Sequence, residues 1–175
     1  MNNILTFFLI LIFFSFGYSQ SDYPEPPRTA TRLFYIQHSN NHNTYVYDAN
    51  IKERRIDASH PINAYRIVYM QDGVKKPLTS LQKKLAYEMI LLESQPNLFI
   101  FHLSATENIR FYLSYDEYKG ARVYVTINKT KMYLDKMFIQ LKDGFLGFNY
   151  KVEYVLLNGK DYNSHEPVSE KFIVE

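Results

Sequence analysis

The 175-residue sequence contains no cysteine and no tryptophan. Without cysteine the chain can form no disulfide, no thiolate metal site, no cysteine nucleophile and no lipid anchor on an N-terminal cysteine. Without tryptophan it lacks the largest aromatic side chain that could stack on a sugar ring. We therefore interpret its sixteen tyrosines mainly as strand-forming residues that bury the ring and expose the hydroxyl.

The sequence also lacks the short motifs of several common enzyme classes. It has no G-x-S-x-G elbow, no HExxH pair, no P-loop and no GxGxxG fingerprint, so no cofactor is predicted. The charges are nearly balanced. The sequence has 20 Lys and Arg residues and 18 Asp and Glu residues, which gives a net charge of +2. This balance argues against nucleic acid or an acidic membrane surface as a partner.

The N-terminus carries an apolar run, residues 4–17, built almost entirely from Ile, Leu, Phe and Thr. It is shorter than the ~20 residues that a membrane span needs, and Gly17 and Ser19 supply the small residues of a cleavage site. We expect residues 1–19 to be a cleaved signal peptide, with export to the periplasm or the cell exterior and no stable transmembrane span afterwards. An uncleaved anchor is the alternative, because residues 1–3 contain no Lys or Arg.

Three prolines, Pro24, Pro26 and Pro27, follow within residues 20–31. Proline lacks a backbone donor and favours extended conformations, so this segment is predicted to be an exposed leader. The length of the chain indicates one domain, which we place at residues 32–175.

Alternating apolar and polar residues, rich in aromatic and β-branched types, predict about nine strands in that domain. Asp143-Gly144 and Asn158-Gly159 are typical of tight hairpin turns. The alternation from Leu146 to Leu156 predicts the main core strand. The strands are expected at residues 32–38, 44–51, 62–70, 98–104, 108–115, 121–128, 132–141, 145–157 and 168–174.

One helix is predicted between the third and fourth of these strands. Thr79 and Gln82 have the spacing of a capping box, in which each side chain bonds the other residue's backbone N–H. Leu81, Leu85 and Met89 recur at four-residue spacing and predict an apolar face that packs on the sheet.

Regular strands and turns with one short helix, at about 79–90, predict an all-β fold. We expect an antiparallel β-meander that closes into a barrel-like fold, because closure removes exposed sheet edges. A two-sheet β-sandwich is the alternative.

The densest group of side chains able to bind a ligand lies at the tip of the first predicted hairpin. Amides and imidazoles at a barrel mouth can donate and accept hydrogen bonds to a polar ligand, although turn formation explains asparagines there equally well. The ligand-binding candidates are His38, Asn40, Asn41, His42 and Asn43.

Three histidines form an alternative candidate, a metal site. His38 and His42 are four residues apart across the turn, and His60 precedes the third predicted strand. Imidazole is a common zinc ligand, whereas surface histidines beside a turn are the simpler interpretation.

Two long segments, RLFYIQHSNNHNTYVYDANI and PINAYRIVYMQDGVKKPLTSLQKKLAYEM, together with the end from Val168 to Phe172, resemble a domain-of-unknown-function family of small exported bacterial proteins. The resemblance implies export and a single domain, and it implies no activity, cofactor or site.

The export signal, the all-β pattern and the missing catalytic motifs favour a non-enzymatic binding module for a small polar ligand or an envelope component. Two alternatives stay open: a metal-dependent or histidine-based hydrolase, and a structural or assembly protein of the cell envelope.

Overall fold

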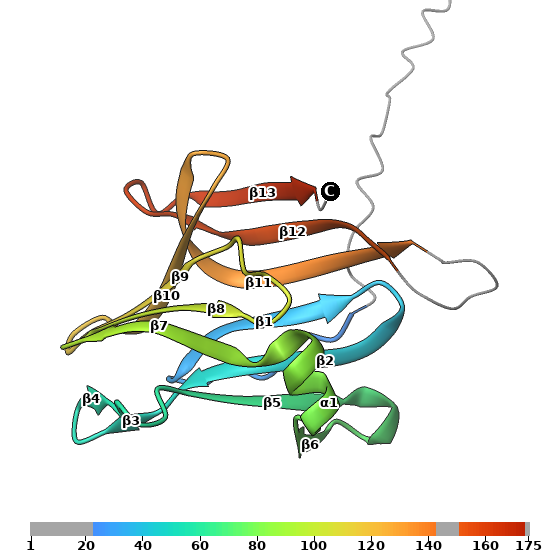
Figure 1. The fold of residues 1–175 in the computed structure, drawn as a ribbon, viewed down its shortest axis with the longest axis horizontal. Coiled ribbons are helices and arrows are strands. Elements are labelled where there is room, and N and C mark those ends of the chain that lie inside the picture. Colours follow the sequence, from blue (N-terminus) through green and yellow to red (C-terminus); the bar gives the residue numbers. More distant parts are fainter. Residues whose placement is uncertain (1–22, 143–150, 174–175) are drawn as a thin grey trace, which may run out of the picture.

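The computed structural model describes residues 23–142 and 151–173. Among these residues most of the chain forms one large curled sheet, a half-barrel, so the expected all-β, barrel-like fold is confirmed (Figure 1). The strands are β1 (Arg32–His38), β2 (Asn41–Ala49), β3 (Ile51–Lys52), β4 (Arg55–Ile56), β5 (Ile62–Val68), β6 (Val74–Pro77), β7 (Met89–Gln95), β8 (Leu98–Leu103), β9 (Phe111–Asp116), β10 (Gly120–Ile127), β11 (Thr130–Lys142), β12 (Lys151–Asp161) and β13 (Pro167–Ile173).

Two antiparallel meanders are joined at a single parallel seam. The order of strands across the sheet is β6-β5-β2-β1-β11-β10-β9-β8-β7, with β12 and β13 off this path beside β11. The pairing of β1 with β11 is parallel, from Tyr35↔Lys136 to His38↔Ile139, and every other described pairing is antiparallel. Strands β3 and β4 form a small separate ribbon.

Strand β11 serves two neighbours along one of its edges. Residues 130–133 pair with β10, and residues 136–139 pair with β1. Strand β12 runs along the opposite edge throughout. In Figure 1, β11 accordingly lies first beside β10 and then beside β1. The two strands β10 and β1 diverge where the edge of β11 passes from one to the other, and we call this place the sheet fork.

Asp135 lies at the sheet fork as the extra residue of a β-bulge. The β11–β12 register passes from Leu134↔Gly159 to Lys136↔Asn158 and skips Asp135. A bulge bends its strand and increases the local twist, which lets β11 turn from one neighbour to the other.

Gly159 faces this bulge at very close range. A Cβ atom there would lie 1.8 Å from the carbonyl oxygen of Tyr133, so only glycine fits.

The predicted hairpin turn at Asn158-Gly159 is wrong, because both residues lie inside β12. The turn comes at residues 162–166, where the Asp161 carboxylate accepts hydrogen bonds from two backbone N–H groups. The other predicted turn, Asp143-Gly144, lies outside the described residues.

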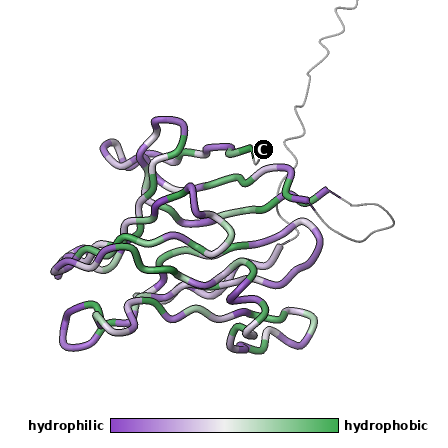
Figure 2. Tube along the Cα trace, in the orientation of Figure 1, coloured by the Kyte–Doolittle hydropathy of each residue, from purple (hydrophilic) through white to green (hydrophobic). Residues whose placement is uncertain are grey.

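The main core joins residues of both meanders. Phe34 lies at its centre, with ring-centroid distances of 4.5 Å to Tyr47 and 5.8 Å to Phe111. A smaller cluster of Val46, Tyr65 and Ile67 packs on the other face of the first meander. Figure 2 shows the resulting alternation of apolar and polar residues along the strands.

The predicted core face of β12 is wrong in its described part. Val155 and Leu157 are buried, at 4% and 0% exposure, whereas Val152 is 36% exposed. Apolar residues occupy consecutive positions here, so alternation does not select a face. Residues 145–150 of this predicted strand lie outside the described residues.

The helix forms where it was expected, but it packs through another face. Helix α1 (Ser80–Gln82) continues as a π-helical segment, η2 (Lys83–Tyr87), and the capping box is present. Leu81 and Leu85 are 65% and 64% exposed. Tyr87 is buried, as is the preceding Leu78, which lies in the main core.

The π-helical segment changes the residue period from Lys83 onward, so four-residue spacing does not describe the face beyond Gln82. Residues 89 and 90, which were predicted to be helical, begin β7.

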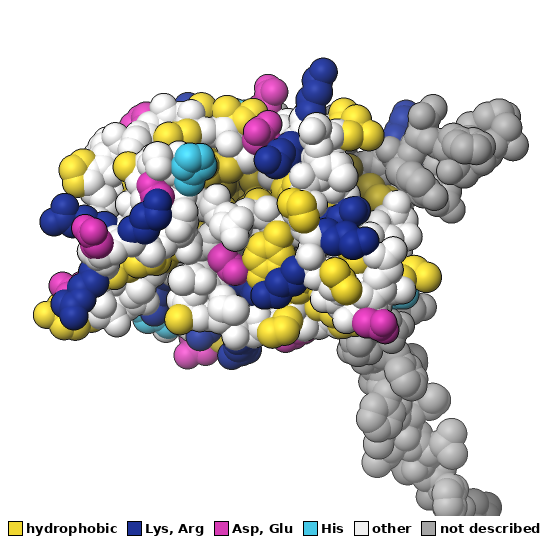
Figure 3. Space-filling model, turned by 90° about the horizontal axis from the view of Figure 1, so that it is seen from below, with side chains coloured by type: hydrophobic (Ala, Val, Ile, Leu, Met, Phe, Trp, Pro, Cys, Tyr) yellow, Lys and Arg dark blue, Asp and Glu magenta, His cyan; other side chains and the backbone are white. Residues whose placement is uncertain are grey.

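On the face of the molecule seen in Figure 3, exposed apolar side chains lie among charged ones of both signs. None of the helices in the described part of the chain is long and apolar enough to cross a membrane.

We predict that Gly159→Ala lowers the free energy of unfolding by about 3 kcal/mol, because a methyl group would overlap backbone that cannot move without disturbing the bulge. Urea unfolding measures this. Gly120→Ala is the control: its Cβ would meet no atom within 4 Å, and its positive φ costs only about 1 kcal/mol. Equal losses in the two variants would contradict the close approach at the sheet fork.

A second pair of variants tests which face of the helix packs. Leu78→Ala should cost about 3 kcal/mol, because it leaves a cavity in the core. Leu81→Ala should change the free energy of unfolding by about 0.5 kcal/mol or less, because this side chain is exposed. The opposite ranking in thermal or urea unfolding would show that the face predicted from the spacing is buried.

Candidate functional site: a groove at the sheet fork

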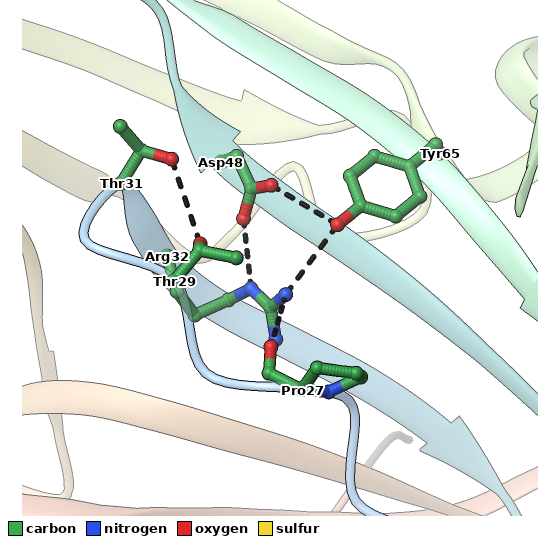
Figure 4. Close-up of polar contacts among 6 residues, drawn as sticks. All are labelled: Pro27, Thr29, Thr31, Arg32, Asp48 and Tyr65. Carbon is green, nitrogen blue, oxygen red and sulfur yellow. Dashed lines mark hydrogen bonds and ion pairs between the residues drawn. The ribbon is translucent and has the colours of Figure 1, made fainter.

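The leader, residues 23–31, is held against β1 by a network around Arg32 (Figure 4). Arg32 Nε donates to Asp48 Oδ1 at 2.8 Å, and Arg32 Nη2 donates to the Pro27 carbonyl oxygen at 3.0 Å. Tyr65 Oη donates to the second oxygen of Asp48 at 3.0 Å. Arg32 and Asp48 are partners in the β1–β2 register, so strand pairing positions the ion pair.

A groove opens beside this network, in two lobes. Lobe one, about 640 Å³, lies between the leader, β1, β11, β12 and the start of β13. Lobe two, about 540 Å³, lies within the sheet fork between β1, β10 and β11. The lobes adjoin, because Arg32, Leu33, Asp135 and Lys160 line both of them, and we call the two together the fork groove.

The sheet fork explains why a groove exists there. The ladder with β11 begins at Tyr35 in β1 and at Tyr124 in β10. In the described structure, residues 32–34 and 120–123 therefore have no strand partner on the side that faces the fork. The diverging ends leave a gap in the sheet that side chains only partly fill.

The fork groove is rich in positive charge. Six cationic side chains line it against two carboxylates, Glu25 and Asp135, in a chain whose net charge is only +2. Of the six, only Arg32 forms an ion pair with another described residue. The six are Arg28, Arg32, Lys119, Arg122, Lys136 and Lys160.

Burial perturbs three titratable groups in lobe one. It raises the pKa of the Asp135 carboxyl, although Lys160, Arg28 and Arg122 oppose this shift. It lowers the pKa of the Lys136 amine and raises that of the Tyr35 phenol to about 12. Such shifts gather at functional sites, because binding and chemistry require partly desolvated polar groups.

Asn158 adds an unused donor to lobe one. Its Oδ1 accepts a hydrogen bond from Ser169 Oγ at 2.5 Å, which fixes the orientation of the amide. Its Nδ2 is buried and has no hydrogen-bond partner among the described residues. A buried donor left unpaired costs about 1–3 kcal/mol, so an acceptor on a ligand would gain from meeting it.

His38, a predicted ligand-binding residue, lies in the interior. It is only 9% exposed, and its Nε2 is 2.6 Å from Tyr87 Oη. The rings of Tyr45 and Tyr87 stack at 3.8 Å and both meet the imidazole edge-on. Burial lowers the pKa of His38 to about 4, so the imidazole is neutral at pH 7.

The asparagines of the tip bond to one another. Asn41 Oδ1 accepts from the backbone N–H of Asn43 at 2.9 Å, and Asn41 Nδ2 donates to Asn40 Oδ1 at 2.8 Å. His42 is exposed, with its ring 5.2 Å from that of Tyr23. The tip thus uses its amides to build the turn, and its ligand-binding role stays a prediction.

The three histidines proposed as metal ligands have separate surroundings. His60 is exposed, and its Nδ1 is 3.1 Å from Ser59 Oγ, which donates to Asp57 Oδ1. Within residues 23–142 and 151–173, no group of three or more His, Cys, Asp or Glu side chains could hold a metal ion. Since the Ser59 proton is bound to a carboxylate, His60 does not activate this hydroxyl as a nucleophile.

Sequence reasoning missed the fork groove, although one signal pointed to it. In β11 the buried residues Met132 and Leu134 are two apart, but the next, Met137, is three further on. The break falls on two consecutive charged residues, Asp135 and Lys136. A period of two that slips by one residue is typical of a β-bulge, and bulges are frequent beside functional sites.

The fold and the groove define an all-β half-barrel protein with a charged groove beside its parallel seam. The family described as "Domain of unknown function (DUF4833)" matches residues 34–171, and the chain belongs to this family. The resemblance to a domain-of-unknown-function family is thereby confirmed. No curated protein and no solved structure matches the chain.

The neutral, buried His38 predicts a dependence of stability on pH. The unfolded chain binds a proton with the ordinary pKa of 6.5 and the folded chain only near 4. Between these values the unfolded state binds more protons, so stability falls as pH drops from 6.5 to 4, by about 3 kcal/mol for this group.

His38→Gln should remove that part of the slope in urea unfolding measured from pH 7 to pH 4. His42→Gln, an exposed neighbour, is the control and should keep the wild-type slope. If the curves of His38→Gln and wild type run parallel, the assignment to His38 is wrong.

Proposed function

We propose that the protein is an exported, non-enzymatic binding module that holds a small polar ligand in the fork groove. The observation that carries the proposal is the meeting of two lobes at Asp135, where cations without ion partners and the unused Asn158 donor converge. Concave sites with a few convergent polar groups and perturbed pKa values are the usual form of ligand sites.

The groove is a better candidate than the hairpin tip. Two hydrogen bonds join the asparagines of the tip to one another, whereas Asn158 Nδ2 is buried and has no described partner. The groove also combines two pockets, each within the ~300–1,000 Å³ of ordinary ligand sites.

Binding is favoured over hydrolysis by the side chains that are present. A hydrolase that acts through a nucleophile or a metal ion would need an activated side chain or a metal-bound water. The groove offers cations, two carboxylates and amide or hydroxyl groups, which suit recognition. The histidine-based alternative depends on His38, His42 and His60, whose contacts are with different partners.

The experiment is capture of small molecules from an extract of the host. Wild type and Lys160→Glu are dialysed against the small-molecule fraction, recovered and analysed by native mass spectrometry. Wild type should retain a polar compound that Lys160→Glu loses, because the substitution places negative charge where both lobes meet.

Arg110→Glu is the matched control, since Arg110 is exposed and does not line the groove. This variant should retain the same compound as wild type. Capture by all three proteins alike, or by none of them, would refute the groove as a ligand site.

A further inference from the structure

We infer that the ligand of the fork groove is a linear acidic oligosaccharide, with carboxylates in each lobe and sugar hydroxyl groups at the centre, where the lobes meet. This inference rests on the proposed function and specifies its ligand. It follows from the length of the groove, the distribution of its charges and the polar groups at its centre.

The size of the groove favours an extended ligand. Each lobe alone, at about 640 and 540 Å³, has the volume of an ordinary small-molecule site. Because the lobes adjoin along four shared residues, a ligand of a single ring would fill only one of them. A chain of several linked rings would occupy both.

Positive charge is present separately in both lobes. Arg28 and Lys136 line lobe one only, whereas Lys119 and Arg122 line lobe two only. The Arg122 guanidinium lies 5.4 Å from the centre of the Tyr133 ring, a cation–π contact that limits its motion. A guanidinium positioned in this way can bind a carboxylate through two hydrogen bonds.

The centre of the groove has a different character. Asp135 and Lys160 line both lobes, so a carboxylate and an ammonium group stand together where the lobes meet. An anionic group placed there would be repelled by Asp135. Hydroxyl groups, which both donate and accept, can pair with a carboxylate and an ammonium at once.

Asn158 supports the same ligand chemistry from the side of lobe one. Its Nδ2 is a buried donor without a described partner, and its Oδ1 is bonded to Ser169 Oγ. A ring oxygen or a hydroxyl oxygen of a sugar supplies the acceptor. The arrangement of cation, polar centre and cation therefore matches acidic sugars better than a compact polyanion.

The test compares three probes, each with four repeat units, by isothermal titration calorimetry. Tetragalacturonate carries carboxylates and hydroxyls, maltotetraose carries hydroxyls only, and tetrapolyphosphate carries charge without hydroxyls. We expect tetragalacturonate to bind about tenfold or more tightly than either of the others, because each charge-assisted hydrogen bond is worth about one decade in affinity.

Groove variants locate the binding. Arg28→Gln and Arg122→Gln should each weaken tetragalacturonate about tenfold, while Arg110→Gln, outside the groove, should bind as wild type does. Asp135→Asn should weaken tetragalacturonate and tighten tetrapolyphosphate, because it removes the negative charge that strengthens hydrogen bonds from sugar hydroxyls and repels phosphate. Circular dichroism and thermal unfolding confirm that each variant is folded.

The outcomes separate this inference from the proposed function. Equal or tighter binding of maltotetraose or tetrapolyphosphate overturns the acidic-sugar assignment, and the binding module stands if host compounds are still captured. Tetragalacturonate binding that neither arginine variant weakens also overturns it. Loss of both probe binding and host-compound capture refutes the inference and the proposed function together.

Discussion

The parallel pairing of β1 with β11 is the constraint on which the rest of the structure depends. It joins residues about one hundred positions apart, Tyr35 with Lys136 and His38 with Ile139, and so connects two meanders that otherwise consist of neighbouring strands. Such a non-local pairing stabilises the fold only after the chain has lost the conformational entropy of closing a long loop. The two meanders are therefore joined by strands that lie far apart in the sequence.

The sheet fork follows directly from this seam. Because β11 already pairs with β10 through residues 130–133, β1 can join it only further along the same edge. The strand must bend between its two neighbours, and the bulge at Asp135 supplies the bend. Gly159 lets β12 stay paired across that bend. The fork groove is thus a consequence of the topology, and Arg32 completes its wall by holding the leader in place.

Features set by local sequence could be predicted, and features set by distant contacts could not. The capping box at Thr79 and Gln82 depends on residues three apart, and it forms as expected. The buried face of the helix depends on its contacts with the rest of the fold. The spacing of Leu81 and Leu85 predicted that these residues are buried, but both are exposed. The candidate site shows the same division. Its strands were largely expected, but the convergence of Arg122, Asp135 and Lys160 depends on which strands pair, and alternation carries no information on that.

The fork groove also differs from the rest of the fold in how its residues affect stability. In the core, apolar side chains stack and pack, and the buried His38 has a partner in Tyr87. In the groove, a partly desolvated amine on Lys136 and an unpaired amide donor on Asn158 each oppose folding. Residues that break the local sequence pattern and lower stability are expected mainly at functional sites. This is the physical reason to place ligand binding at the fork and not at the turn of the first hairpin.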